Sequence, residues 1–323
     1  MDDLRAGGAD AGGPRRTSLR VAAVQATPAL LDRSATLSIV ADEVGRAAAD
    51  GSDLVVFPES FVPGYPDWAW RQNPMSDGEW YDRFAREAVD LDGPDLDDVR
   101  TAARAAGVWV ALGITERVRS GTLYNTVVYL DREGRVAGRH RKLVPTGAER
   151  LVWAMGRSHL LTVVDIEGVR VGSLICWENY MPLARAAMYE QGVDVLLAPT
   201  WDNSEEWVPT LRHIAKEGRL FVVGVTACIC GADVPRDLPG ADTIYGGEED
   251  WLSRGNTTIV APGGAILAGP LVGERGVVSA TLDLGQLAGA RRLFDPVGHY
   301  ARPDVLSLVH HRQPGEAPAA PMG

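Results

Sequence analysis

The sequence predicts an α/β protein. Short runs rich in Val, Ile and Leu alternate along the chain with segments in which apolar residues recur at helical spacing. The apolar runs are continuous rather than alternating with polar residues, which is typical of strands in sheets covered by helices. The chain has 323 residues, 46% of them hydrophobic, and is therefore long enough to bury a sizeable core.

The first half of the chain opens with two Val-containing runs, residues 19–25 and 53–57, that predict strands. Between them, residues 34–49 show the spacing of an amphipathic helix. The remaining elements predicted in this half are helices at 79–89 and 94–106, then strands at 108–115 and 123–130.

The second half repeats the alternation. Apolar runs predict strands at residues 160–166, 169–176, 194–198, 220–226 and 256–261. Helical spacing predicts helices at residues 182–191 and 207–219.

Composition also predicts the domain organisation. Residues 1–18 and 307–323 are rich in Gly, Ala, Pro or polar residues, and we expect loose tails on either side of one domain at 19–306. Within that domain, residues 231–250 carry Gly, Pro, Asp and Glu with little periodicity. They predict a long surface insertion.

Charge and cysteine content restrict the partners. The formal net charge is −11 and the pI is about 5.1, so a nucleic-acid partner is not expected. No apolar run reaches the roughly 20 residues that cross a bilayer, so no membrane partner is expected. The N-terminus lacks the apolar core of a secretory signal. Cys176, Cys228 and Cys230 form an odd, sparse set, which favours a cytoplasmic location.

Glu59 is the first candidate for chemistry. It follows a Val-rich strand and Pro58, so a carboxylate stands where a buried strand stops. Ligands collect at the carboxyl ends of strands in α/β sheets. The alternative is a solvated loop carboxylate, which is the usual environment of a charged loop residue.

Lys142 is the second candidate. It ends the basic run His140-Arg141-Lys142, and such a run usually forms a solvated face because a buried ammonium loses its hydration. Glu149, seven positions later, is a possible partner that would keep Lys142 charged.

Cys176 is the third candidate. It ends an apolar strand, and Pro182 suits the first turn of the following helix. A thiol near a helix N-terminus and a lysine is expected to have a lowered pKa and to be more nucleophilic. A buried structural cysteine is the alternative, and we interpret Cys228 and Cys230 in that way.

Other catalytic signatures are missing from the sequence. The six histidines are scattered and form no metal-binding motif, and there is no Gly-x-Ser-x-Gly elbow, P-loop or dinucleotide fingerprint. These absences argue against a serine hydrolase and against nucleotide or dinucleotide binding, and the sequence shows no metal-binding signature.

Three motifs in order resemble the nitrilase branch of the carbon–nitrogen hydrolase superfamily. Residues 57–66 read Phe-Pro-Glu-Ser-Phe-Val-Pro-Gly-Tyr-Pro, residues 139–146 read Arg-His-Arg-Lys-Leu-Val-Pro-Thr, and residues 176–179 read Cys-Trp-Glu-Asn. The likeness extends from about residue 20 to about residue 306, nearly the whole chain. The last motif favours nitrilases over the amidase and carbamoylase branches.

The resemblance implies a four-layer αββα sandwich in which Glu59, Lys142 and Cys176 converge, with Glu149 as a supporting second glutamate. It implies hydrolysis of an organic nitrile by water to a carboxylic acid and ammonia, without a cofactor. Aromatic residues near the three motifs are candidates for the pocket wall, although core packing is an equal alternative for each: Tyr65, Trp153, Trp177 and Trp201.

The resemblance also implies a homo-oligomer. Residues 182–191 would form a dimer face, and residues 231–250 a second contact that extends dimers into spirals. An amidase or N-carbamoyl hydrolase with the same Cys-Glu-Lys set is the nearest alternative function. A catalytically silent assembly protein is a further alternative, and the three intact residues argue against it.

Overall fold

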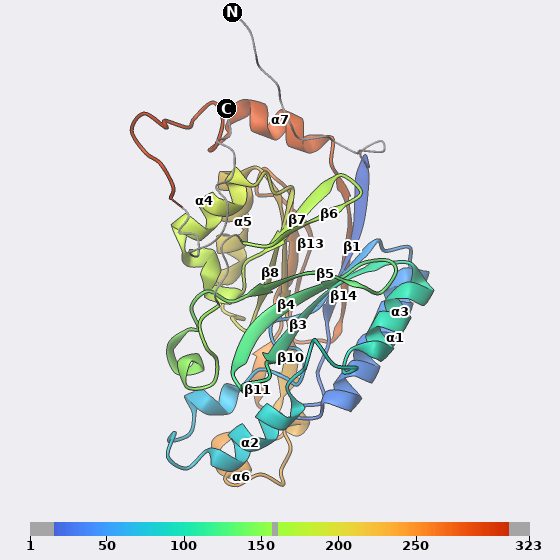
Figure 1. The fold of residues 1–323 in the computed structure, drawn as a ribbon, viewed down its shortest axis with the longest axis vertical. Coiled ribbons are helices and arrows are strands. Elements are labelled where there is room, and N and C mark those ends of the chain that lie inside the picture. Colours follow the sequence, from blue (N-terminus) through green and yellow to red (C-terminus); the bar gives the residue numbers. More distant parts are fainter. Residues whose placement is uncertain (1–15, 157–160, 310–323) are drawn as a thin grey trace, which may run out of the picture.

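The computed structural model describes residues 16–156 and 161–309. In this described part, two six-stranded sheets lie face to face, and helices cover the outer face of each sheet (Figure 1). The architecture is therefore an α/β sandwich with the layer order αββα, which confirms the predicted fold class.

The first sheet has the strand order β14-β1-β2-β3-β4-β5. Strands β1, β2 and β3 pair in parallel, and the other neighbours are antiparallel. Helices α1 and α3 pack on the outer face through one apolar cluster. The bounds are Ser18–Gln25 (β1), Arg33–Ala49 (α1), Leu54–Val56 (β2), Asp97–Ala106 (α3), Trp109–Arg117 (β3), Leu123–Leu130 (β4), Val136–Arg141 (β5) and Gly276–Asp283 (β14).

The second sheet has the strand order β13-β12-β9-β8-β7-β6. Strands β7, β8 and β9 are parallel, and helices α4 and α5 cover the outer face. The bounds are Val163–Ile166 (β6), Val169–Ser173 (β7), Pro182–Glu190 (α4), Val195–Thr200 (β8), Trp207–Gly218 (α5), Phe221–Thr226 (β9), Thr257–Val260 (β12) and Ile266–Leu271 (β13).

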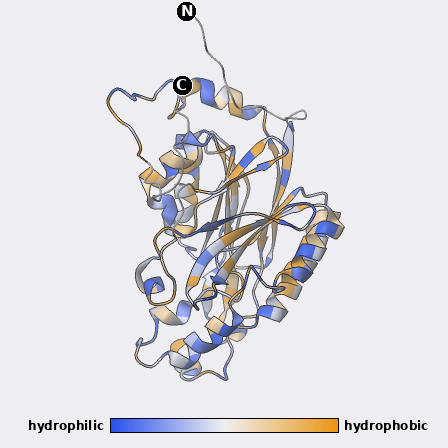
Figure 2. Ribbon diagram, in the orientation of Figure 1, coloured by the Kyte–Doolittle hydropathy of each residue, from blue (hydrophilic) through white to orange (hydrophobic). Residues whose placement is uncertain are grey.

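The main core lies between the two sheets. Val21 on β1, Val171 on β7 and Val223 on β9 belong to one cluster, and all three are fully buried. Burying one such side chain contributes about 1.5–3 kcal/mol relative to leaving it exposed. Apolar residues accordingly concentrate in the strands, whereas the helices carry both polar and apolar residues (Figure 2). This core holds the carboxyl ends of β2, β7 and β8 at fixed positions relative to one another.

The predicted strands and helices are all present, with ends that shift by a few residues. Residue 160, the first of one predicted strand, lies outside the described residues. The edge strands β5, β13 and β14 and the helix α7 (Gln286–Leu293) were not predicted. Many of their side chains are exposed, so they lack the continuous apolar runs of the central strands.

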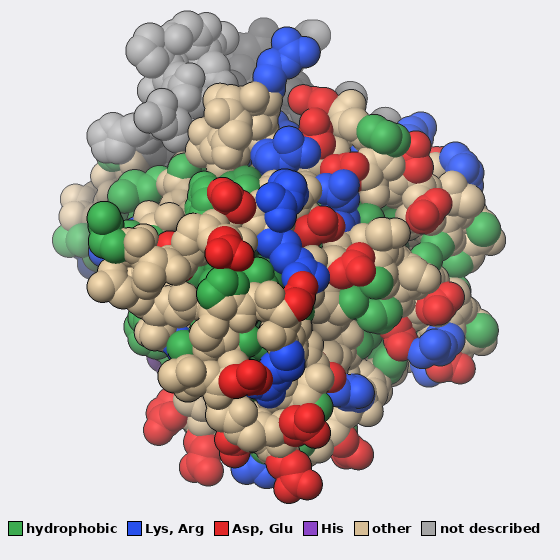
Figure 3. Space-filling model, turned by 90° about the horizontal axis from the view of Figure 1, so that it is seen from below, with side chains coloured by type: hydrophobic (Ala, Val, Ile, Leu, Met, Phe, Trp, Pro, Cys, Tyr) green, Lys and Arg blue, Asp and Glu red, His purple; other side chains and the backbone are tan. Residues whose placement is uncertain are grey.

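Residues 231–250, predicted as a surface insertion, are packed against α2 (Gly78–Glu87). The segment contains the short helix α6 (Ala241–Ile244) and lies between β10 (Cys228–Cys230) and β11 (Trp251–Arg254). Trp80 donates its indole N–H to Pro239 O at 2.9 Å, and Arg83 forms an ion pair with Asp237 at 2.8 Å. Figure 3, seen from below in the view of Figure 1, shows acidic and basic side chains interspersed on this end of the molecule.

Most residues of the two predicted tails, 1–15 and 310–323, lie outside the described part of the chain. Among the residues that are described, no helix has both the length and the apolar character needed to cross a membrane.

Candidate active site

Three charged side chains from separate segments meet in the interior. Lys142 immediately follows β5, and its Nζ donates to Glu59 Oε1 and to Glu149 Oε2, each at 2.8 Å. All three side chains are at most 1% exposed. Lys142 is therefore not part of a solvated basic face, and Glu59 is not a solvated loop carboxylate.

Glu59 is oriented by groups from both sheets. Asn125 on β4 donates its side-chain amide to Oε1 at 2.7 Å, and the backbone N–H of Trp201, just after β8, donates to Oε2 at 2.7 Å. Both carboxylate oxygens therefore have fixed donors. Asn125 was not predicted, because a single polar residue within the strand 123–130 forms no motif.

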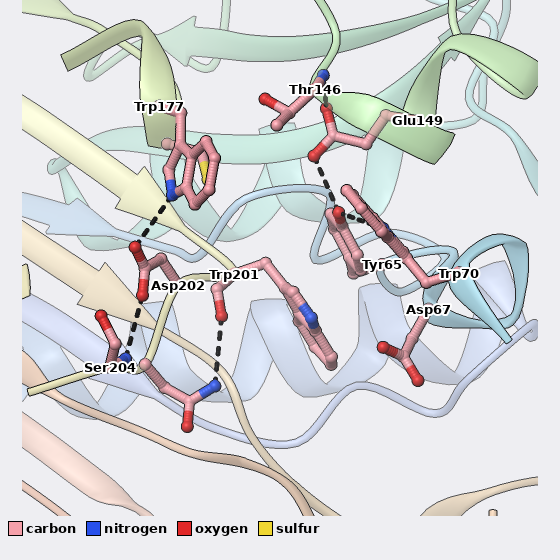
Figure 4. A pocket seen from close by; sticks show the side chains of 11 residues that line it. Tyr65, Asp67, Trp70, Thr146, Glu149, Trp177, Trp201, Asp202 and Ser204 are labelled. Atoms are coloured by element: carbon pink, nitrogen blue, oxygen red, sulfur yellow. Dashed lines mark hydrogen bonds between the residues drawn. The ribbon is translucent and has the colours of Figure 1, made fainter. Parts of the chain in front are cut away.

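Glu149 is held in the same way. It lies on the 3-10 turn η2 (Gly147–Leu151), where its Oε2 also accepts from the Thr146 backbone N–H at 2.7 Å. The Tyr65 hydroxyl donates to Oε1 at 2.7 Å (Figure 4). Glu149 thus links the Lys142 ammonium to an aromatic residue of the pocket wall.

Cys176 begins the 3-10 turn η3 (Cys176–Tyr180), three residues beyond the end of β7. Its φ is +53°, in the left-handed region that a non-glycine residue rarely adopts. The Asn179 side-chain amide donates to Leu174 O at 2.7 Å and to Cys176 O at 2.9 Å, on either side of the sharp turn. Pro182 then opens α4 at its first position, so the predicted strand-turn-helix geometry is confirmed.

The electrostatics of the site differ from the sequence-based expectation for Cys176. Burial raises the pKa of the thiol well above its usual value, and the nearby Glu59 and Glu149 carboxylates raise it further, while Lys142 lowers it. The expectation of a lowered pKa was wrong because two carboxylates and a single ammonium surround a buried sulfur. The surroundings of the sulfur therefore favour the thiol over the thiolate.

The pKa values of Glu59 and Lys142 are raised as well. Burial raises the pKa of Glu59, and Glu149 adds to that shift, although Lys142 opposes it. For Lys142, burial acts to lower the pKa, but Glu59, Cys176 and Glu149 outweigh it and raise the pKa. The raised pKa makes Glu59 a stronger base than an ordinary carboxylate, and the raised pKa of Lys142 favours its charged form.

A cavity of about 440 Å³ opens over Cys176 and Glu149. Three aromatic residues named from the sequence line it, namely Tyr65, Trp177 and Trp201. The rings of Tyr65 and Trp201 stack with centroids 4.5 Å apart at 6°, and the Trp177 indole donates to Asp202 at 2.9 Å (Figure 4). The cavity therefore offers flat aromatic walls next to the Cys176 thiol.

Trp153 lies elsewhere than expected. It is not among the residues that line the cavity, and its ring packs edge-on against Tyr65 at 5.7 Å. Its indole N–H donates to Thr115 Oγ1 at 3.2 Å. Trp153 therefore contacts the wall residue Tyr65 and does not itself line the cavity.

Several lining residues were missed by the sequence analysis: Asp67, Trp70, Thr146, Asp202, Asn203 and Ser204. They lie in the segments that follow β2, β5 and β8, and Asp67 and Trp70 form the two ends of the 3-10 helix η1 (Asp67–Trp70). Their position after strand ends was the available signal, since loops at the carboxyl ends of strands line α/β sites. Within the described residues, no group of three or more His, Cys, Asp or Glu side chains is arranged to hold a metal ion.

Sequence comparison finds close relatives across the whole chain. A family model described as carbon-nitrogen hydrolase matches residues 20–292. An aliphatic nitrilase from Sinorhizobium fredii is 39% identical over 307 residues, covering 93% of this chain and 98% of that protein. A bifunctional nitrilase/nitrile hydratase from Nicotiana tabacum is 38% identical over 302 residues, covering 90% of this chain and 86% of that protein.

Structural comparison agrees on the fold. A carbon-nitrogen hydrolase from Helicobacter pylori superposes with a TM-score of 0.70 at 20% identity, covering 89% of this chain and 96% of that one. The αββα layers and the buried Glu-Lys-Glu cluster are thus accompanied by extensive sequence similarity. The chain belongs to the carbon–nitrogen hydrolase family, within its nitrilase branch.

Proposed function

We propose that this protein hydrolyses organic nitriles to carboxylic acids and ammonia, with Cys176 as the covalent nucleophile. The observation that carries the proposal is the shared pocket. Cys176 and Glu149 line one cavity, and Glu149 and Glu59 bind the same Lys142 ammonium. The sequence similarity to nitrilases from Sinorhizobium fredii and Nicotiana tabacum supports the substrate class.

The first half of the reaction makes a thioimidate. Glu59 takes the proton of the Cys176 thiol, and the thiolate forms a C–S bond to the nitrile carbon while one π bond of the C≡N group becomes a nitrogen lone pair. The proton held by Glu59 then passes to that nitrogen. Lys142 stabilises the negative charge that develops on the substrate, as an electrostatic group aimed at the transition state does.

The second half releases the products. A water loses its proton to Glu59 and attacks the thioimidate carbon, and Glu59 passes that proton to the nitrogen, giving a tetrahedral species with hydroxyl, amino and thioether groups. The hydroxyl proton then passes by way of Glu59 to the amino group, and cleavage of the C–N bond releases ammonia and leaves a thioester. A second water cleaves the C–S bond, so the acid leaves and Cys176 regains its proton.

The tetrahedral species can also break down in a second way. Cleavage of the C–S bond in place of the C–N bond releases an amide and the thiolate. An amide by-product is therefore part of the proposal, and a bifunctional nitrilase/nitrile hydratase among the relatives supports it. An amidase that uses the same side chains remains the second candidate, because amidases share this fold.

The decisive experiment compares aromatic, arylaliphatic and aliphatic nitriles with their amides while ammonia, acid and amide are measured together. We expect release of acid and ammonia from at least one nitrile, at a rate above that from its amide. Cys176→Ala is expected to abolish turnover. An amide substrate that is hydrolysed while every nitrile is left intact would favour the amidase.

Assembly and location are also part of the proposal. We infer a homo-oligomer of at least a dimer with α4 at the contact, because Leu183 at the start of α4 is 69% exposed. A second contact through 231–250 would extend it. Light scattering that finds only particles of 34.7 kDa would remove this inference. The free thiols of Cys176, Cys228 and Cys230 support a cytoplasmic location.

A further inference from the structure

Glu178 connects the backbone next to Cys176 with the backbone next to Lys142. Its carboxylate is buried, and Oε2 accepts from the Ile175 N–H at 2.6 Å while Oε1 accepts from the Leu143 N–H at 2.6 Å. Ile175 immediately precedes Cys176, and Leu143 immediately follows Lys142. One side chain therefore spans the two sheets at the point where thiol and ammonium must meet.

His140 completes this connection. Its Nε2 lies 2.9 Å from Glu178 Oε2, and both side chains are fully buried. An ionised carboxylate only accepts hydrogen bonds, so His140 donates from Nε2. His140 lies on β5 two positions before Lys142, which places both on the side of the strand that faces the second sheet.

We propose that Glu178 and His140 are positioning residues that set where Cys176 stands relative to Lys142. This inference rests on the proposed nitrile hydrolysis. Neither side chain lines the cavity, so each acts through the backbone of its neighbours.

The strained backbone of Cys176 gives this role its physical basis. A non-glycine residue with a φ of +53° keeps that conformation only when its surroundings impose it. The Glu178 bond to the preceding N–H and the Asn179 bond to Cys176 O are such restraints. Without the first restraint, the turn has room to relax and the sulfur moves away from Lys142.

Misplacement of the sulfur has a distinct chemical signature. Ammonia leaves only if the amino group of the tetrahedral species is protonated near Glu59, whereas thiolate departure needs no such alignment. A displaced sulfur should therefore favour cleavage of the C–S bond, which releases the amide. The fraction of amide among the products reports this directly, and the fraction does not depend on how much of the enzyme is folded.

The test is the variant Glu178→Gln. Its kcat, its KM and the fraction of amide among its products are measured on the nitrile that the wild-type protein converts fastest. A glutamine has one oxygen acceptor, and its amide N–H₂ faces a backbone N–H, so one restraint is lost. A shift of about 1 Å at the reacting atoms can lower the rate about 10²-fold. We expect a fall in kcat of that order, little change in KM and a larger amide fraction.

Glu116→Gln is the matched control. Glu116 on β3 is also a buried carboxylate held by residues of β5, with Arg139 at 2.8 Å and Arg141 at 2.6 Å. The hydrogen bonds to its carboxylate come from Thr126, Arg139 and Arg141, and none comes from the segment that contains Cys176. Glu116→Gln should lower stability yet leave the amide fraction at the wild-type value. An amide fraction that is unchanged in Glu178→Gln, or equally changed in Glu116→Gln, would overturn the inference.

A second pair of variants keeps the test decisive if Glu178→Gln does not fold. His140→Gln retains an N–H donor toward Glu178, whereas His140→Leu removes it. We expect the amide fraction to stay near wild type in the first and to rise in the second. Equal fractions in both variants would contradict the role of His140.

Alkylation separates this inference from the proposed function. The rate at which iodoacetamide labels the peptide that contains Cys176 needs no substrate, and we expect Glu178→Gln to slow it while Glu116→Gln does not. A wild-type protein that converts no nitrile would remove the proposed function. Equal labelling rates in wild type and Glu178→Gln would remove the positioning role alone.

Discussion

Lys142 lies 2.8 Å from Glu59 although 83 positions separate them along the chain. Glu149 binds the same ammonium, so the buried site holds two carboxylates for one cation. Burial is the main cause of the raised pKa of both the Cys176 thiol and Glu59. The two carboxylates raise the pKa of the thiol further, whereas Lys142 opposes the shift at both groups.

The pH dependence of the reaction should report Glu59. Burial raises its pKa above 4.5, and the carboxylate form is the one that accepts the thiol proton. As pH falls through this raised pKa, Glu59 becomes protonated and activity is lost. The acid limb of kcat/KM, measured on a neutral nitrile, should have its midpoint above 4.5. An acid limb at or below that value would contradict the assignment.

Lys142→Met should destabilise the protein as well as inactivate it. The methionine fills similar space but leaves two buried carboxylates without their cation, and breaking a buried pair in this way costs about 3–5 kcal/mol. Urea unfolding measures that loss. The double variant Lys142→Met/Glu149→Gln should recover part of it, because only one carboxylate then remains. A single variant as stable as wild type would argue against the buried ion pairs.

Tyr65→Phe separates hydrogen bonding from packing at the pocket wall. The phenylalanine keeps the stack on Trp201 but removes the 2.7 Å bond to Glu149. A hydrogen bond to a charged group contributes about 1.5–3 kcal/mol, so kcat/KM should fall about ten- to a hundredfold. Tyr65→Ala, which also loses the stack, should raise KM further. Steady-state kinetics on an aromatic nitrile make the comparison.

The charge of the pocket should govern which nitriles enter. Asp67, Glu149 and Asp202 are among the lining residues, and no Lys or Arg is. A nitrile that carries a carboxylate, such as 4-(cyanomethyl)benzoate, should react more slowly than phenylacetonitrile. Near the solvent, one such repulsion amounts to about 1 kcal/mol, a few-fold in kcat/KM.

Asp202→Asn tests that charge effect directly. Asparagine keeps an oxygen that can accept from Trp177, so the wall is retained. The preference for the neutral nitrile should shrink in this variant and at high salt, which screens exposed charges. A preference that is insensitive to both changes would point to shape rather than charge.

The central strands and the site motifs could be predicted from the sequence because their signals are local. The Val-rich run before Glu59 is buried throughout, and the run before Cys176 is buried except at Arg170, so each is recognisable as a mainly apolar stretch. The strand β14 could not be predicted in this way. Its burial alternates weakly, and it exists because its backbone pairs with β1 from the far end of the chain.

The position of Trp153 and the pKa of the Cys176 thiol could not be predicted from neighbouring residues in the sequence either. Nearness in sequence placed Trp153 at the substrate, yet in the folded chain Tyr65 lines the cavity and Trp153 packs against Tyr65. Nearness to a lysine suggested a lowered thiol pKa, but the pKa depends on all charges around the sulfur and on its burial.

By itself, the sequence determined the α/β class and the succession of the central strands, because these depend on local patterns, and the resemblance to nitrilases predicted which cysteine, lysine and carboxylates meet. Only the tertiary structure decided that Glu59 and Glu149 share Lys142, that Glu178 spans the Cys176 and Lys142 segments, and that the surroundings of the sulfur raise the pKa of the thiol. Distances across two sheets and the loss of water around buried charges determine those properties, and both arise only when distant segments pack together.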